Sequence, residues 1–222
     1  MISKIPKWVW IGVAFLALSA GFINVVAFLG FTHKAITHVT GNLSVFSSSL
    51  YKGDTPAIIH LLILIFSFFL GSVLSGAIIM DGHLKLGRSY GVALFIEAFL
   101  LLAATFCFLQ NSFWGEALAS MACGLQNAMV STYSGAIIRT THMTGVLTDL
   151  GSLIGQFIQG MQIDVRRLKI HSLIISSFIV GGYLGSVCFT KLSYQALFIP
   201  SILILSLAII YTVILFQSKT KS

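Results

Sequence analysis

The chain has 222 residues, of which 57% are hydrophobic and only 9% are charged, and its mean hydropathy is +0.97. Soluble domains carry about 25% charged residues, so this composition excludes a water-soluble domain. It indicates an all-α, polytopic membrane protein of one domain, residues 1–222, surrounded by the lipid bilayer. The net charge of +7 is no sign of nucleic-acid binding, because Lys and Arg of membrane proteins collect in cytoplasmic loops.

The chain starts with an apolar segment that imitates a secretory signal peptide. Lys4 and Lys7 precede this segment, and small residues occur near Ser19 and Ala20. The apolar run continues to about residue 31, which is long enough to span a bilayer. It also contains Gly-Phe-Ile-Asn, a motif that returns later in the chain. We therefore expect this segment to remain in the protein as the first transmembrane helix.

Six stretches reach the roughly 20 apolar residues that a spanning helix needs. They are residues 8–31, 56–80, 89–109, 113–138, 172–190 and 195–216. Two further stretches, 40–52 and 144–162, are too short or too polar to span, and both begin with Thr-Gly. The chain therefore has either six transmembrane helices plus two re-entrant half-helices, or eight transmembrane helices.

The distribution of Lys and Arg favours six spans with both termini in the cytoplasm. In that arrangement ten of the 13 Lys and Arg residues face the cytoplasm, and only Lys34, Lys52 and Lys191 face outside. With eight spans the division becomes eight against five. We therefore expect six spans.

The two halves of the chain share motifs at a nearly constant spacing. Gly-Phe-Ile-Asn at 21–24 returns as Gly-Leu-Gln-Asn at 124–127, an offset of 103 residues. His-Val-Thr-Gly-Asn at 38–42 returns as His-Met-Thr-Gly-Val at 142–146, an offset of 104 residues. The chain therefore has the pattern of a tandem repeat.

A third match supports duplication of the whole unit. Gly-Ser-Val-Leu-Ser-Gly at 71–76 resembles Gly-Gly-Tyr-Leu-Gly-Ser at 181–186, with an offset of 110 residues. Repeat one then covers about 8–109, and repeat two covers about 113–216. Because each repeat would hold three spans, an odd number, we expect the second to be inverted relative to the first, as in many transporters.

Several of these motifs also point to a known family. The stretches "AGFINVVAFLG", "THVTGN", "GLQNAMVS" and "RTTHMTGVLTDLG" resemble the YoaK family of bacterial membrane proteins, and the resemblance extends over nearly the whole chain. It implies a six-span protein of the bacterial inner membrane, and it implies no established substrate. The residues that match the family's pattern are Asn24, His38, Thr40, Gly41, Asn42, Asn127, Thr141, His142, Thr144, Gly145, Thr148 and Asp149.

We expect each Thr-Gly to mark the start of a re-entrant half-helix. The segment 32–39 can reach about 26 Å when extended, and a helical return of about twelve residues covers about 18 Å. The turn at Thr40 can therefore reach the middle of the membrane. Thr40 or Asn42 suits a helix N-cap, and Gly41 lets a ligand or another backbone approach closely. The second copy would do the same from the cytoplasmic side.

Two half-helix N-termini would then face each other near the bilayer centre. Such termini carry partial positive charge and unpaired N–H donors, and irregular backbone at this depth must be buried or line a polar cavity. This predicts a binding site for a small polar or anionic solute. The residues expected to contact it are Asn24, His38, Thr40, Gly41, Asn42, Gln126, Asn127, His142, Thr144, Gly145 and Thr148. The alternative is that both motifs are helix caps in a packed bundle.

Two acidic residues suit proton or ion coupling, because acids inside membranes are commonly functional but usually paired. Asp149 lies five residues into the second half-helix, where the first copy has Val45 or Phe46. It either carries a proton or Na⁺, or it forms an ion pair with Arg139 or a histidine. Glu97, near the middle of its span, either relays a proton or makes a buried hydrogen bond.

The two matched histidines, His38 and His142, suit solute contact or proton relay, since histidine titrates near neutral pH. Their spacing is not diagnostic of a metal site, and we expect no metal and no cofactor. An enzyme is not expected either, because the chain has no nucleophile–base pair, no His-Glu-x-x-His motif and no paired carboxylates at a useful spacing.

The sequence therefore predicts a transporter or channel-like protein, with proton coupling as one version. The rival interpretation is a structural or regulatory membrane protein, in which the same polar residues only cap and join helices. Gly-x-x-x-Gly at 151–155 and 181–185 is expected to pack helices inside the bundle, with a homodimer face as the alternative. The basic segment 164–171 is expected to be a cytoplasmic loop, with lipid head-group binding as the alternative.

Overall fold

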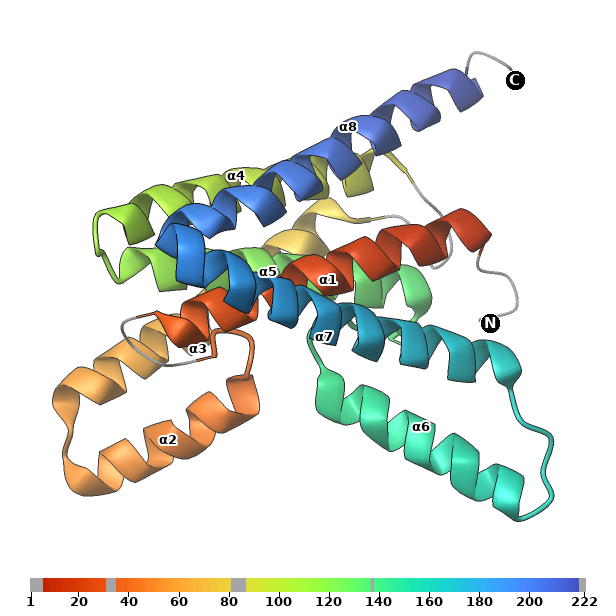
Figure 1. Ribbon diagram of the computed structural model, residues 1–222, viewed down its shortest axis with the longest axis horizontal. Helices are drawn as coiled ribbons and strands as arrows, with labels where there is room; N and C mark the ends of the chain where they lie inside the picture. The colour runs from red at the N-terminus through yellow and green to blue at the C-terminus, as the bar shows by residue number, and fades with distance from the viewer. Residues whose placement is uncertain (1–5, 31–34, 81–86, 137, 220–222) are drawn as a thin grey trace.

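The computed structural model describes every residue except 1–5, 31–34, 81–86, 137 and 220–222 (Figure 1). Its helices are α1 (Lys7–Leu29), α2 (Val39–Lys52), α3 (Thr55–Ile78), α4 (Arg88–Leu109), α5 (Trp114–Ser134), α6 (Met143–Ile158), α7 (Val165–Leu192), the 3-10 helix η2 (Ser193–Leu197) and α8 (Phe198–Lys219). The described part of the chain contains no strand, so the all-α prediction is confirmed. Of the cations used in the charge count, Lys4, Lys34, Lys85 and Lys221 lie outside the described residues.

Long apolar helices give the chain the character of a membrane protein. Four stretches are long and apolar enough to cross a bilayer: Val9–Leu29, Thr55–Ile78, Arg88–Leu109 and Val165–Gln217, the last of which joins α7, η2 and α8. A helix lies at each of the six stretches predicted to span. The central helix α5 is the one long described helix outside those four stretches, because its small and polar residues lower its hydropathy.

Helix α7 begins at Val165, earlier than the predicted start of its span at residue 172. The reason is an N-cap: a carboxylate oxygen of Asp164 accepts hydrogen bonds from the backbone N–H groups of Arg166 and Arg167, each at 3.1 Å. The basic segment 164–171 is therefore the start of a helix, and its prediction as a loop is wrong. The cap places Arg167 and His171 on a helix that faces α6.

The core is built by helices that approach one another closely. Helix α1 packs along α7, α3 packs along α5, and α4 lies against both α5 and α8. At two crossings, α1 with α7 and α3 with α5, glycines meet backbone carbonyls of the partner helix. The contacts are Gly21 with Phe178, Gly181 with Leu18, Gly124 with Phe68, and Gly71 with Met121. A Cβ atom at any of these glycines would lie 1.9–2.1 Å from that carbonyl oxygen, so a larger residue would force the helices apart.

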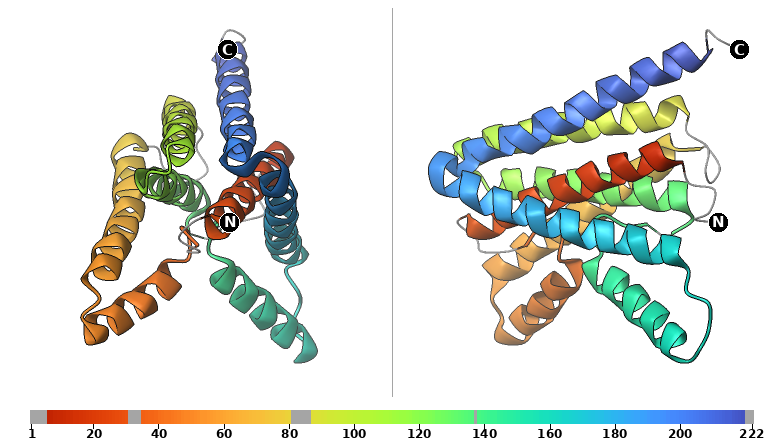
Figure 2. Two further views of the ribbon diagram at one scale, coloured as in Figure 1. Left: turned by 60° about the vertical axis from the view of Figure 1, so that its left-hand side comes forward. Right: turned by 45° about the vertical axis from the view of Figure 1, so that its right-hand side comes forward.

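The two short helices, α2 and α6, lie on one side of this bundle (Figures 1 and 2). Each starts near the middle of the long axis, and the two run outward toward opposite ends. Helix α2 contacts α3, helix α6 contacts α7, and most residues of both are exposed. The predicted short helices at 40–52 and 144–162 are confirmed in position, with observed bounds Val39–Lys52 and Met143–Ile158.

The two Gly-x-x-x-Gly segments have different surroundings. Gly181 and Gly185 pack against the backbone of α1, as predicted. Gly151 and Gly155 are exposed on α6, and no atom lies within 4 Å of a Cβ built on either. The prediction that 151–155 packs inside the bundle is therefore wrong for the single chain, because α6 contacts α7 through its other face, at buried Val146 and Leu153.

Candidate functional site

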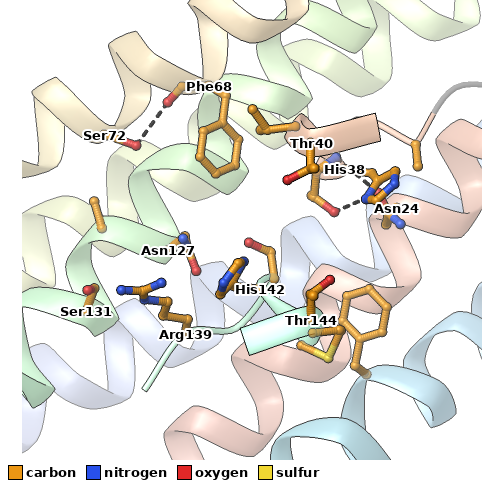
Figure 3. Close-up of a pocket in the computed structure, with 17 residues that line it drawn as sticks. Asn24, His38, Thr40, Phe68, Ser72, Asn127, Ser131, Arg139, His142 and Thr144 are labelled. Atoms are coloured by element: carbon orange, nitrogen blue, oxygen red, sulfur yellow. Dashed lines mark hydrogen bonds between the residues drawn. The ribbon is translucent and has the colours of Figure 1, made fainter. Parts of the chain in front are cut away.

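A cavity of about 640 Å³ lies between the starts of α2 and α6. Its lining comes from both halves of the chain, and Figure 3 shows His38 and Thr40 on one side with His142 and Thr144 on the other. The lining residues are Asn24, Ala35, Thr37, His38, Val39, Thr40, Phe68, Ser72, Asn127, Ala128, Ser131, Arg139, Thr141, His142, Met143, Thr144 and Phe178. We call this the central cavity.

The N-caps of the two short helices are the histidines. His38 precedes α2 with φ −86° and ψ 61°, and His142 precedes α6 with φ −92° and ψ 65°. Neither helix receives a hydrogen bond from a capping side chain, so the first-turn N–H groups keep donor capacity beside the cavity. The predicted cap at Thr40 or Asn42 is wrong: Thr40 is helical, and the buried Asn42 side chain donates to the Ala35 carbonyl at 3.3 Å.

The histidine of each motif explains why a glycine follows it three residues later: the ring leaves no room for a side chain there. A Cβ atom at Gly41 would lie 2.1 Å from Cδ2 of His38, and one at Gly145 would lie 2.2 Å from Cδ2 of His142. Each imidazole therefore lies directly over the first turn of its own helix. The expectation that Gly41 leaves room for a ligand or another backbone is wrong, since the ring fills that room, and neither Gly41 nor Asn42 lines the central cavity.

The two repeated asparagines both line the central cavity, but they are bonded differently. Oδ1 of Asn24 accepts hydrogen bonds from the backbone N–H of Thr37 at 3.1 Å and from its hydroxyl at 2.8 Å. Oδ1 of Asn127 is buried and accepts no hydrogen bond from the described residues. A buried acceptor without a donor is costly, so Asn127 is the lining residue best prepared to receive a hydrogen bond from a solute or water.

Gln126 lies behind the wall of the central cavity and does not line it. Its Nε2 donates to Oε1 of Glu97 at 2.7 Å, and its Oε1 accepts from the hydroxyl of Thr140 at 2.6 Å. The buried Glu97 therefore makes the hydrogen bond that was one of its two predicted roles. This chain of three side chains connects α4 and α5 to the segment that leads into His142.

Asp149 faces a second cavity of about 420 Å³ on the α6 side. We call it the α6 cavity; its lining is Ala136, Arg139, His142, Thr144, Gly145, Val146, Thr148, Asp149 and Arg167. Oδ2 of Asp149 lies 3.9 Å from Nε2 of the buried His171 on α7, in agreement with the predicted alternative of a histidine partner, although the sequence did not single out His171. The predicted contacts Gly145 and Thr148 belong to this cavity and not to the central one.

Each short helix also carries a stripe of hydroxyl groups that was not predicted from the sequence. Thr40, Ser44 and Ser48 repeat every four residues on α2, and Thr144, Thr148 and Ser152 repeat at the same spacing on α6; all six are exposed. The hydroxyls of Ser44 and Thr148 donate to the carbonyls of Thr40 and Thr144 at 3.1 and 2.9 Å. The two stripes are 104 residues apart, the same offset as the two His-x-Thr-Gly motifs, and this match in the sequence could have predicted them.

Comparison with known proteins identifies a family and nothing closer. The family model described as "Protein of unknown function (DUF1275)" matches residues 12–210. This is the YoaK family, so the resemblance found in the sequence is confirmed. No curated protein and no solved structure matches the chain.

Proposed function

The chain belongs to the DUF1275 family, and we propose that it is a transporter or channel-like protein for a small polar or anionic solute. It acts in the bacterial inner membrane, with both termini in the cytoplasm, and it needs no cofactor and catalyses no reaction. The solute binds in the central cavity between the starts of α2 and α6.

The observation that carries this proposal is the convergence of two uncapped helix N-termini on one polar cavity. Helix N-termini offer N–H donors and partial positive charge, which suit anions and hydrogen-bond acceptors. Asn127, the two histidines and Arg139 add further polar groups to the lining. A 640 Å³ space lined by this many polar groups is typical of a binding site.

Six spans in two inverted repeats are part of the proposal, with residues 1–222 as a single domain. The glycine contacts support a repeat. Residues of α1 correspond to residues of α5 at an offset of 103, and residues of α3 correspond to residues of α7 at an offset of 110. Under this correspondence, each glycine contact between α1 and α7 has a counterpart between α3 and α5. The pairs that correspond are Gly21–Phe178 with Gly124–Phe68, and Gly71–Met121 with Gly181–Leu18. Helices α1 and α5, which correspond, also run in opposite directions along the long axis (Figure 1).

Coupling to protons is assigned to Glu97 and Asp149. The hydrogen-bonded chain from Glu97 through Gln126 to Thr140 ends two residues before His142, so a change of charge at Glu97 would reach the start of α6. Asp149 sits with His171 in the α6 cavity, which shares His142 and Thr144 with the central cavity.

The first test is thermal unfolding of the purified protein with a panel of anions, amino acids, nucleobases and sugars, because a ligand that binds the folded state raises its stability. A selective stabilisation by one solute is expected to disappear in Asn127→Ala and to persist in Ser206→Ala, an exposed control on α8. That solute should then cross proteoliposome membranes. If no solute stabilises the protein, and Asn127→Ala only lowers the melting temperature, the structural or regulatory role is the better account.

A further inference from the structure

The α6 cavity has more charged groups in its lining than the central cavity has. Arg139 and Arg167 both line it, together with Asp149 and His142. Among the described residues, no carboxylate lies within ion-pair distance of either guanidinium, and Nε of Arg167 is buried without a hydrogen-bond partner. A buried N–H donor without a partner is costly, so this position favours an acceptor that the described residues do not supply.

The other half of the chain provides an internal control for these charges. Asp54 and Asp164, the N-caps of α3 and α7, fix the offset between these two helices at 110 residues, and Arg167 then corresponds to Ala57. By the offset of 104, Arg139 corresponds to Ala35 and Asp149 to Val45. The α2–α3 hairpin forms without any of the charged groups. They are therefore not needed to fold such a hairpin, and their presence in one half alone is explained by a ligand.

The geometry points to a binding site for an oxyanion, a carboxylate or a phosphate-like group, between Arg139 and Arg167 in the α6 cavity. Guanidinium groups bind such anions with two parallel hydrogen bonds. The start of α6, at Thr144 and Gly145, adds N–H donors on the same cavity. Asp149 lowers the net positive charge of the site, and Nε2 of His171 lies 3.9 Å from its Oδ2.

The site is continuous with the proposed solute path. Arg139, His142 and Thr144 line both the α6 cavity and the central cavity, and Figure 3 shows them along one side of the latter. The inference rests on the proposed function in one respect: an anion held at the two arginines is passed to the central cavity. The α6 side is then the side from which the anion enters or leaves. Binding itself does not depend on transport.

The test measures binding of acetate, sulfate and inorganic phosphate to the purified, delipidated protein, by calorimetry at constant ionic strength. At least one of them is expected to bind, and Arg139→Gln and Arg167→Gln are each expected to weaken it about tenfold or more. Arg167→Lys keeps the charge but loses the planar fork, and it should bind with intermediate affinity. Lys191→Gln, which removes an exposed cation at the far end of α7, is the matched control and should bind normally. Asp149→Asn should bind more tightly.

Some results would contradict the proposed oxyanion site, and others would distinguish oxyanion binding from transport. Unchanged binding in both arginine variants, or no oxyanion binding to the wild-type protein, contradicts it, whereas the central cavity could still bind a neutral solute. Binding that depends on the arginines without any flux supports the site and contradicts the proposed transport. The protein is also measured in nanodiscs of phosphatidylcholine with and without phosphatidylglycerol. Arginine-dependent stabilisation by phosphatidylglycerol alone would assign the oxyanion to a lipid and overturn its passage to the central cavity.

Discussion

The substitution Gly145→Ala is expected to weaken solute binding while leaving the stability of the fold nearly unchanged. The new Cβ would lie 2.2 Å from Cδ2 and 2.6 Å from Nε2 of His142. Carbon atoms in contact lie about 3.5–4.0 Å apart, so the imidazole must move by roughly 1 Å or more. The moving atoms belong to the end of an exposed side chain, and α6 itself can stay in place.

The two energetic effects of Gly145→Ala on folding nearly cancel. Alanine favours a helix over glycine by about 1 kcal/mol, and an off-rotamer imidazole costs about 0.5–1.5 kcal/mol. We therefore expect a free energy of unfolding close to that of the wild-type protein. Affinity for the stabilising solute should nevertheless fall about tenfold, because a hydrogen-bonding group of the cavity is displaced.

The assay is denaturant unfolding together with ligand titration, and the matched control is Gly151→Ala on the same helix. No atom lies within 4 Å of a Cβ at Gly151, so this variant should gain about 1 kcal/mol of helix stability and keep its affinity. Equal affinities for the solute in the two variants would refute the assignment of His142 to the site.

Three further substitutions test the packing and the polar network. Gly124→Ala, whose Cβ would meet the Phe68 carbonyl oxygen at 2.1 Å, should destabilise the protein by about 1–3 kcal/mol in an unfolding titration, whereas Gly76→Ala, with no neighbour, should not. Gln126→Leu removes the partner of both Glu97 and Thr140 and should cost about 1–3 kcal/mol; an unchanged midpoint would argue against the network. Asp164→Ala removes the cap of α7 and should cost about 1 kcal/mol, with hydrogen exchange accelerated in the first turn of that helix and not at its other end.

The positions of the helices could be read from the sequence because hydropathy and polar interruptions are local signals. The starts of α2 and α6 were predicted within one residue, at Thr40 and Thr144, since both follow a repeated His-x-Thr-Gly. The role of the glycine could not be predicted in the same way. It depends on the χ angles of the preceding histidine, which place the ring over the first turn, and no spacing rule contains that information.

The composition of the site was only partly predictable for a related reason. Gln126 and Asn127 are neighbours on α5, yet successive residues of a helix point about 100° apart, so one lies behind the wall and the other in the cavity. Arg167 and His171 were overlooked because the segment reads as a basic loop. An aspartate followed by helix-forming residues, repeated at Asp54 and Asp164, was the signal for an earlier helix start.

The central claim is that a water-accessible cavity lies at the meeting point of the two short helices, and thiol labelling tests it most directly. Cys107, Cys123 and Cys188 are first replaced by alanine, and a single cysteine is then placed at Thr40, at Thr144 or, as an exposed control on the outer face of α4, at Phe99. In lipid vesicles, a membrane-impermeant methanethiosulfonate reagent should modify positions 40 and 144, and the stabilising solute should slow both reactions, while position 99 stays unreactive in the hydrocarbon region. Failure of both positions 40 and 144 to react would contradict the account and favour a packed bundle.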